Sequence, residues 1–247
     1  MIVNDGKIKV AYILPNMLTA ISLFLGILSI ISSSKGEFEK AAFFIFISLI
    51  FDGLDGRVAR MTGTTSKFGV EFDSLADLIA FGVAPAMLGY YQYGHDFEKF
   101  GVLVAGLFAV FGAIRLARFN VMTSDTEPNV FIGLPIPAAA VFMGCVSLVY
   151  AGHTELKEYS SAILWISMMV SILMVSNIRF SSFKKIDFKK SDFMKTFVTI
   201  LALFSFLYLY FLETLTLLMS LYLLSGPTRA AYNLLTRKIK FRKTIEK

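Results

Sequence analysis

Charged side chains are scarce in this sequence, and cysteine and histidine are nearly absent. Asp, Glu, Lys and Arg make up 17% of the 247 residues, below the roughly 25% of an average soluble domain. The single cysteine, Cys145, excludes an internal disulfide framework and is expected only to pack against apolar neighbours. His95 and His153 form no spaced cluster of ligands, which argues against a zinc site.

Apolar residues, in contrast, make up 56% of the chain, and the mean hydropathy is +0.67. They occur in runs of roughly 20 residues, the length that crosses a bilayer core, and not in the alternating ten-residue segments of a membrane barrel. The sequence therefore predicts an all-α polytopic membrane protein with about eight transmembrane helices. We expect spans near residues 12–33, 39–60, 73–94, 100–119, 134–152, 160–178, 194–211 and 213–232.

The first apolar run follows Lys7 and Lys9, as in a signal peptide. It is too long for a signal sequence and no A-x-A cleavage site follows it, so we expect a retained first helix. If both termini are cytoplasmic, 20 Lys and Arg residues lie on the cytoplasmic side, including those of 179–190 and 237–247, and only four lie outside. This asymmetry follows the positive-inside rule and predicts cytoplasmic termini.

Four aspartates stand close together in the stretch FDGLDGRVARMTGTTSKFGVEFDSLAD. Asp52 and Asp55 are three residues apart and Asp73 and Asp77 four apart, so each pair shares one face of a helix. The intervening residues 63–66 are turn formers that let two helices return antiparallel. The two acidic pairs are therefore expected to face each other at the cytoplasmic edge of the membrane.

Four carboxylates in such a place need compensation, because like charges and desolvation both disfavour ionisation. Bound divalent cations provide it, and oxygen ligands favour magnesium, manganese or calcium. Two ions about 4 Å apart are the arrangement that phosphate chemistry uses. The alternative is a solvated acidic cap, or carboxylates neutralised by Arg57 and Arg60.

The neighbours of the aspartates favour a diphosphate ligand. Gly56 lies inside a helix, where glycine costs up to about 1 kcal/mol relative to alanine, and close approach of a ligand explains it. Arg60 lies one turn further on, with donors suited to phosphate. Gly69 lies four residues before Asp73, and Ser66 can cap that helix or donate to a ligand.

Residues 52–77 fit the pattern D-x2-D-G-x2-A-R-x8-G-x3-D-x3-D at all eight fixed positions. This stretch resembles the signature of the CDP-alcohol phosphatidyltransferase family. The resemblance implies the CDP-alcohol phosphotransferase fold and transfer of a phosphatidyl group from CDP-diacylglycerol or CDP-archaeol to an alcohol, with release of CMP. It also implies two divalent ions, Mg²⁺ or Mn²⁺, and a homodimer.

Carried onto this chain, the resemblance implies that the four aspartates ligate the ions and that Asp77 also takes the proton of the attacking hydroxyl. It implies a CDP-lipid site formed by Asn16, Thr19, Asp52, Gly56, Arg60 and Ser66. Asn16 and Thr19 belong to PNMLT at the cytoplasmic end of the first helix, where they are caps as often as ligands.

Two later stretches concern the acceptor: IRLARFN at residues 114–120 and FIGLPIPAAA at residues 131–140. Together they resemble the phosphatidylserine synthase branch of the family, which implies L-serine as the acceptor. An arginine and an amide suit a carboxylate, so Arg118 and Asn120 are the expected serine ligands, with Arg115 beside them. Arginines that anchor the helix end in the interface are the alternative.

Other functions stay open at this stage. The same transfer to glycerol 3-phosphate or an inositol phosphate would also use basic residues. A divalent-cation transporter is disfavoured because its acids would lie at the midplane, and a prenyltransferase because its acidic motifs lie on separate helix pairs. Nucleic-acid binding is not expected. We expect one catalytic domain over 1–247 in the cell membrane, with a core motif at 52–77, acceptor-side segments at 114–137, and further helices at 194–232.

Overall fold

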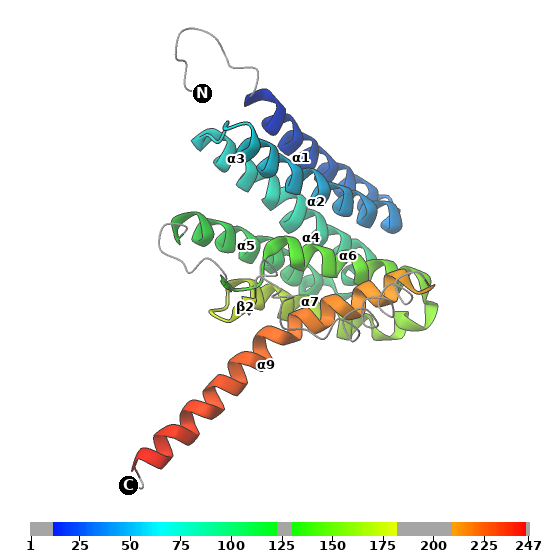
Figure 1. The fold of residues 1–247 in the computed structure, drawn as a ribbon. Helices are drawn as coiled ribbons and strands as arrows, with labels where there is room; N and C mark the ends of the chain where they lie inside the picture. The colour runs from blue at the N-terminus through cyan, green and yellow to red at the C-terminus, as the bar shows by residue number, and fades with distance from the viewer. Residues whose placement is uncertain (1–11, 123–129, 182–208, 246–247) are drawn as a thin grey trace.

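The computed structural model describes residues 12–122, 130–181 and 209–245 of the chain. Nearly all of this part is helical, as the apolar runs predict (Figure 1). In chain order the elements are α1 (Ile13–Ser34), α2 (Phe38–Met61), α3 (Lys67–Asp77), η2 (Leu78–Val83), α4 (Ala84–Gly89), η3 (Tyr90–Gly94), η4 (His95–Phe97), α5 (Glu98–Met122), β1 (Val130–Ile132), α6 (Ile136–Gly152), η5 (Thr154–Tyr159), α7 (Ser160–Val175), β2 (Arg179–Ser181) and α9 (Phe211–Ile245).

Three stretches of the described residues are long and apolar enough to cross a membrane: Ile13–Ser34, Lys67–Met122 and Thr154–Val175. The second is a hairpin and not one rod, because Glu98, with a φ of 44°, turns the chain between η4 and α5. α6 is apolar but shorter. These stretches support a helical membrane protein, whereas the count of about eight spans stays a prediction. The expected span at 194–211 falls largely outside the described residues.

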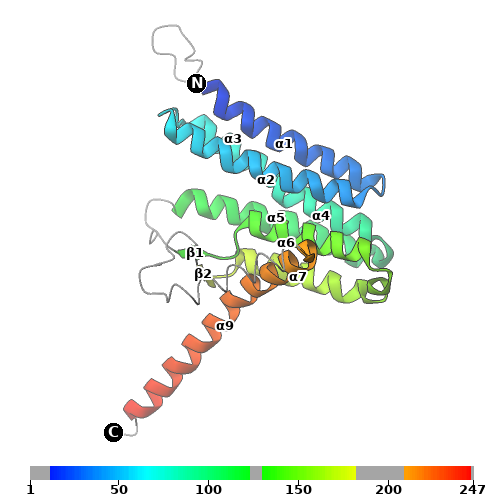
Figure 2. The ribbon, with the colours of Figure 1, turned by 45° about the vertical axis from the view of Figure 1, so that its right-hand side comes forward.

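The helix ends separate onto two sides of the bundle (Figures 1 and 2). The end of α2, the start of α3, the end of α5 and both strands lie on one side, and the loop between α1 and α2 lies on the other. The first side carries arginines such as Arg60, Arg115 and Arg179, and the second carries Lys35 and Lys40. This separation agrees with the charge asymmetry of the sequence. That the arginine-rich side faces the cytoplasm stays a prediction.

Small and hydroxyl-bearing residues let α1 approach its neighbours closely. The hydroxyl oxygens of Ser22 and Ser48 lie 2.8 Å apart between α1 and α2, so both buried groups have a partner. Gly26 of α1 faces η2, where an added Cβ atom would lie 2.8 Å from the Cα atom of Ala80. Since that distance is shorter than van der Waals contact, only glycine fits at this spacing. The contact holds α1 beside the helix that carries Asp77.

The helix that carries Asp73 and Asp77 begins at Lys67, six residues before the expected start of its span at residue 73. It starts early because Ser66 caps it, with its Oγ accepting a hydrogen bond of 3.0 Å from the backbone N–H of Gly69. From η2 onward the helix alternates between π and α geometry. The first π turn lies directly before Pro85, whose missing N–H interrupts the regular ladder of hydrogen bonds.

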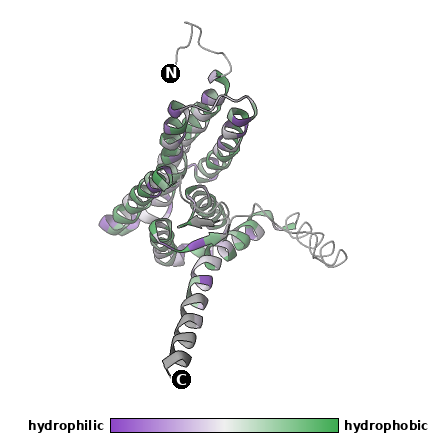
Figure 3. Ribbon diagram, turned by 60° about the vertical axis from the view of Figure 1, so that its left-hand side comes forward, coloured by the Kyte–Doolittle hydropathy of each residue, from purple (hydrophilic) through white to green (hydrophobic). Residues whose placement is uncertain are grey.

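The final helix, α9, packs its first half against α6 and β2, and its second half extends away from the bundle (Figures 1 and 2). The rings of Phe180 on β2 and Tyr222 on α9 lie 5.8 Å apart. The sequence predicts a span at 213–232 followed by a basic tail at 237–247, but α9 continues to Ile245. In Figure 3, hydrophobic residues predominate along most of the bundle, as helices that cross a bilayer require.

We predict that Gly26→Ala destabilises the protein by about 1–3 kcal/mol, because the new methyl group overlaps the backbone of Ala80. The measurement is thermal unfolding of the purified protein in detergent. Gly106→Ala is the matched control, because a Cβ atom at this glycine of α5 meets no atom within 4 Å. Equal thermal midpoints for the two variants would contradict the close approach of α1 and η2.

Candidate active site

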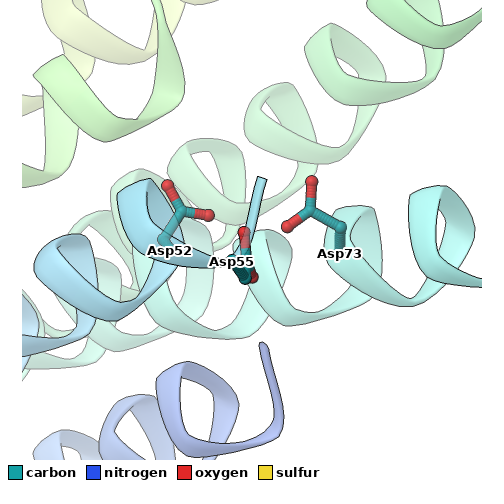
Figure 4. Close-up of side chains that lie close together, drawn as sticks. All are labelled: Asp52, Asp55 and Asp73. Carbon is teal, nitrogen blue, oxygen red and sulfur yellow. The ribbon is translucent and has the colours of Figure 1, made fainter. Parts of the chain in front are cut away.

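Three of the four aspartates lie together where the end of α2 meets α3. One carboxylate oxygen from each of Asp52, Asp55 and Asp73 lies within 4.8 Å of the other two. Figure 4 shows the side chains of Asp52 and Asp73 pointing toward one another, with Asp55 between them. The two acidic pairs therefore face each other, as their spacing predicts. This set of hard oxygen donors fits a divalent cation.

Asp77 lies beside this cluster, within hydrogen-bonding reach of Asp52. Its Oδ1 atom is buried and has no hydrogen-bond partner among the described residues. A buried oxygen without a partner is rare in native structures and is explained by a ligand or ion. Within residues 12–122, 130–181 and 209–245, no salt bridge joins any of the four aspartates to a lysine or arginine. Arg57 and Arg60 therefore form no close ion pair with the aspartates in this part of the chain, although the charge of Arg60 acts on Asp55.

The first helix supports the cluster through a hydrogen bond. Thr19 of α1 is buried, and its hydroxyl lies 2.6 Å from Oδ2 of Asp55 and 3.2 Å from the carbonyl oxygen of Pro15. The shorter contact joins residues 36 positions apart and orients one carboxylate oxygen of Asp55. Asn16, one turn earlier, donates to the carbonyl of Tyr12. Thr19 of PNMLT thus contacts the acidic cluster, whereas Asn16 bonds to the start of its own helix, and the CDP-lipid role that the resemblance implies for both stays a prediction.

A cleft with a volume of about 170 Å³ opens directly beside the aspartates. The residues around it come from the end of α2, the start of α3 and the first turns of α1. They include five that the family resemblance assigns to the CDP-lipid site: Asn16, Thr19, Gly56, Arg60 and Ser66. Asp55 and Asp73 line the same cleft, so the acidic cluster forms part of its wall.

Two glycines keep this cleft open. A Cβ atom on Gly56 would lie 3.2 Å from NH1 of Arg60, so the glycine leaves room for the guanidinium. A Cβ atom on Gly69 would lie 3.2 Å from Oγ of Ser66 and 3.4 Å from Oδ1 of Asn16. Neighbouring side chains thus lie close to both glycines, and the approach of a ligand to Gly56 stays a prediction.

Two threonines of the cleft, Thr64 and Thr65, were not expected from the sequence. Both belong to TGTTS, which we interpreted only as a turn. Thr64 is buried, and its hydroxyl lies 2.7 Å from that of Thr62. The density of hydroxyl groups in a loop beside a predicted phosphate site was the signal available in the sequence.

Arg115 is one of the three expected acceptor residues, and its charge acts on an aspartate of the site. It is 93% buried on α5 and interacts electrostatically with Asp77. Its guanidinium carbon lies 5.3 Å from the ring centroid of Phe119, a cation–π contact. Within the part of the chain that the structure describes, no hydrogen bond or salt bridge involves the Arg115 guanidinium. Its donors are therefore available to an anion.

Arg118 and Asn120 have partners within the protein. Asn120 donates to Oγ of Ser74, next to Asp73, at 2.9 Å. The guanidinium of Arg118 donates to oxygen atoms of β1 and of the end of α7. These are the carbonyl oxygens of Ile132 at 2.9 Å, Val175 at 3.1 Å, Met174 and Ser176 at 3.3 Å, and Oδ1 of Asn177 at 3.4 Å. Direct contact of Arg118 or Asn120 with serine stays a prediction.

The sequence of this chain is similar to that of proteins with known names. The family model described as CDP-alcohol phosphatidyltransferase matches residues 12–173, from α1 to the end of α7. A Helicobacter pylori protein named CDP-diacylglycerol–serine O-phosphatidyltransferase is 46% identical over 224 residues, covering 88% of this chain and 91% of the relative. The archaetidylserine synthase of Methanothermobacter thermautotrophicus is 40% identical over 172 residues, covering 69% and 71% of the two chains.

A Bacillus subtilis protein, also named CDP-diacylglycerol–serine O-phosphatidyltransferase, is 36% identical over 137 residues, covering 56% of this chain and 76% of the relative. The matched region contains all four aspartates and the residues that line the cleft. With a family model over most of the bundle and relatives that extend over nearly the whole chain, this protein belongs to the CDP-alcohol phosphatidyltransferase family.

Proposed function

We propose that the protein transfers the phosphatidyl or archaetidyl group of a CDP-lipid to the hydroxyl of L-serine and releases CMP. The observation that carries this proposal is the cluster of Asp52, Asp55 and Asp73 in the wall of a cleft that Arg60 also lines. The names of the bacterial and archaeal relatives support serine as the acceptor. Membership of a transferase family argues against the cation transporter.

The cleft is the proposed site of the CDP part of the donor. Arg60, Ser66 and Asn16 supply donors at its wall, and Gly56 lets the diphosphate approach the helix. Asp52, in the adjoining acidic cluster, is proposed to bind a metal ion and to lie beside the nucleotide. Thr19 lines the cleft and orients Asp55. The lipid tails remain in the bilayer, which a helix bundle permits through a lateral opening.

The four aspartates are the proposed ligands of two divalent ions, Mg²⁺ or Mn²⁺. The close approach of three carboxylates and the partnerless Oδ1 of Asp77 fit such ions. Bound metal neutralises the diphosphate and stabilises the charge that develops on departing CMP. The protein contributes the spacing of the carboxylates, which α2 and α3 hold from two directions.

The reaction is a direct displacement. The serine hydroxyl oxygen forms a bond to the phosphorus that carries the lipid, and the bond from that phosphorus to the bridging oxygen breaks. The electron pair leaves with CMP, and the hydroxyl proton moves to Asp77 as general base. Asp77 suits this role because its free oxygen lies at the border between the cluster and Arg115. No covalent enzyme intermediate is required.

The acceptor is proposed to bind on the α5 side of Asp77. Arg115 offers a buried guanidinium for the carboxylate of serine. Asn120 and Arg118 complete the expected set at the same end of α5. Glycerol 3-phosphate or an inositol phosphate is the alternative, because either would also bind basic residues.

The setting of this activity is proposed to be the cell membrane, with the active site and both termini facing the cytoplasm. The whole chain, 1–247, is proposed to form one catalytic domain that works as a homodimer. The charge separation between the two sides of the bundle supports this orientation.

We predict that Asp77→Asn lowers kcat for CMP release about 10²–10⁴-fold, because the amide cannot accept the hydroxyl proton. The measurement is CMP release at saturating Mg²⁺ or Mn²⁺, so that weaker metal binding is compensated. Asp96→Asn is the matched control, because this side chain is 91% exposed in a loop far from the cluster along the chain. Full turnover by Asp77→Asn would remove the base assignment.

Purified protein with CDP-diacylglycerol and Mg²⁺ or Mn²⁺ is expected to release CMP with L-serine, and not with glycerol 3-phosphate or inositol phosphate. Arg115 offers a single buried guanidinium, which favours one carboxylate over a phosphate dianion. Chelation of the metal with EDTA should abolish release, and added Mg²⁺ or Mn²⁺ should restore it. CMP released only with a phosphorylated alcohol would overturn the serine assignment.

A further inference from the structure

The two acceptor-side segments, 114–120 and 131–140, meet at the end of α7, where Arg118 and Gly133 contact the last carbonyl groups of that helix. We call this set of contacts the joint. α7 ends at Val175, and the next residue, Ser176, is extended with a ψ of 159°. The last carbonyl groups of a helix have no intrahelical donor. The guanidinium of Arg118 donates to the carbonyls of Met174 and Val175 and also to that of Ile132 on β1. It thus caps α7 with a positive charge, which the helix dipole favours, and ties the helix end to α5 and β1.

Gly133 makes room for this joint. It is buried and has a φ of +78°, and an added Cβ atom would lie 2.5 Å from NH2 of Arg118 and even closer to the carbonyl oxygen of Met174. Its N–H donates to the carbonyl of Ile178 at 2.8 Å, so its backbone is held in place. The position of Arg118 therefore requires a glycine at 133. This explains why RLARFN and GLP occur together in one chain.

The joint occupies the donors that a substrate would need. A guanidinium has five N–H donors in a fixed fork, and a carboxylate binds to two of them side by side. Both terminal nitrogens of Arg118 already face carbonyl oxygens of the protein. Arg115, three residues earlier on the same helix, is buried, and its charge acts on Asp77. The joint therefore fixes the rotation of α5 about its axis and its position along that axis. Together these determine where Arg115 lies.

We propose that Arg118 is a positioning residue that acts together with Gly133, and that it orients Arg115 toward the acceptor without touching the acceptor itself. This inference rests on the proposed function in that serine is taken as the acceptor. A displacement of α5 by a fraction of an ångström at the joint moves the Arg115 guanidinium relative to Asp77. The donor cleft lies on α1, α2 and α3, and none of the printed contacts of Arg118 or Gly133 is with these helices.

The test compares Arg118→Ala, Gly133→Ala and the double variant in steady-state kinetics. Each single change is expected to raise KM for serine about tenfold or more through misplacement of Arg115, with KM for CDP-diacylglycerol within about twofold of wild type. The double variant is expected to be no worse than the poorer single variant, because both changes break one joint. Arg118→Lys should be intermediate, since an ammonium keeps the charge but not the fork.

Gly36→Ala is the matched control. Gly36 also has a φ of +78°, but a Cβ atom there meets no atom within 4 Å, and it lies in the loop on the other side of the bundle. It therefore carries the backbone strain of alanine at positive φ without crowding a neighbour. Its KM values should equal those of wild type within about twofold.

Multiplicative effects of Arg118→Ala and Gly133→Ala on KM for serine would overturn the proposal. So would a raised KM in Arg118→Ala with Gly133→Ala equal to the Gly36→Ala control, since that result indicates direct contact of Arg118 with serine. If the wild-type protein releases no CMP with serine, the proposed function fails separately. The joint is then judged by thermal midpoints, where the two changes should be non-additive, and additive shifts would overturn it.

Discussion

Electrostatic repulsion among four carboxylates at the end of an apolar bundle is the constraint on which the rest of the structure depends. Oxygen atoms of Asp52, Asp55 and Asp73 come within 4.8 Å of one another, and Asp77 contacts Asp52. Such crowding is unfavourable in a low-dielectric setting unless cations balance it. The described residues place the hydroxyl of Thr19 beside Asp55, and the charges of Arg60 and Arg115 act on the cluster without forming a salt bridge. Bound divalent ions are the proposed means by which this repulsion is relieved.

Close packing of helices gives the carboxylates their fixed positions. Gly26 lets α1 reach η2, and the paired hydroxyls of Ser22 and Ser48 hold α1 against α2. At the cleft, glycine has the opposite effect. Gly56 and Gly69 remove side-chain volume there and leave space for a ligand. Glycine therefore has two opposite effects within one bundle: it brings helices together at the core and keeps their ends apart at the surface.

On the proposed acceptor side, hydrogen bonds between side chains and neighbouring elements hold the helices in place, and not the close packing that glycine permits. The end of α5 is joined to α3 through Asn120 and Ser74 and to α7 and β1 through Arg118. Arg115 takes part in neither contact; it is buried, and its charge acts on Asp77. The two arginines differ because they lie at different positions along one helix. Arg115 lies inside the bundle, and Arg118 lies at its edge.

The features that sequence alone determined are local ones. Apolar runs predict the helices, three- and four-residue spacings place each acidic pair on one face, and Gly56 and Arg60 lie one turn apart in any helix. Contacts between distant segments were decided only by the tertiary structure. Thr19 meets Asp55 across 36 positions, and Arg118 meets Val175 across 57. An arginine that caps a helix and one that binds a carboxylate have the same side chain. Only the position of the neighbouring helix end, which depends on packing, distinguishes them.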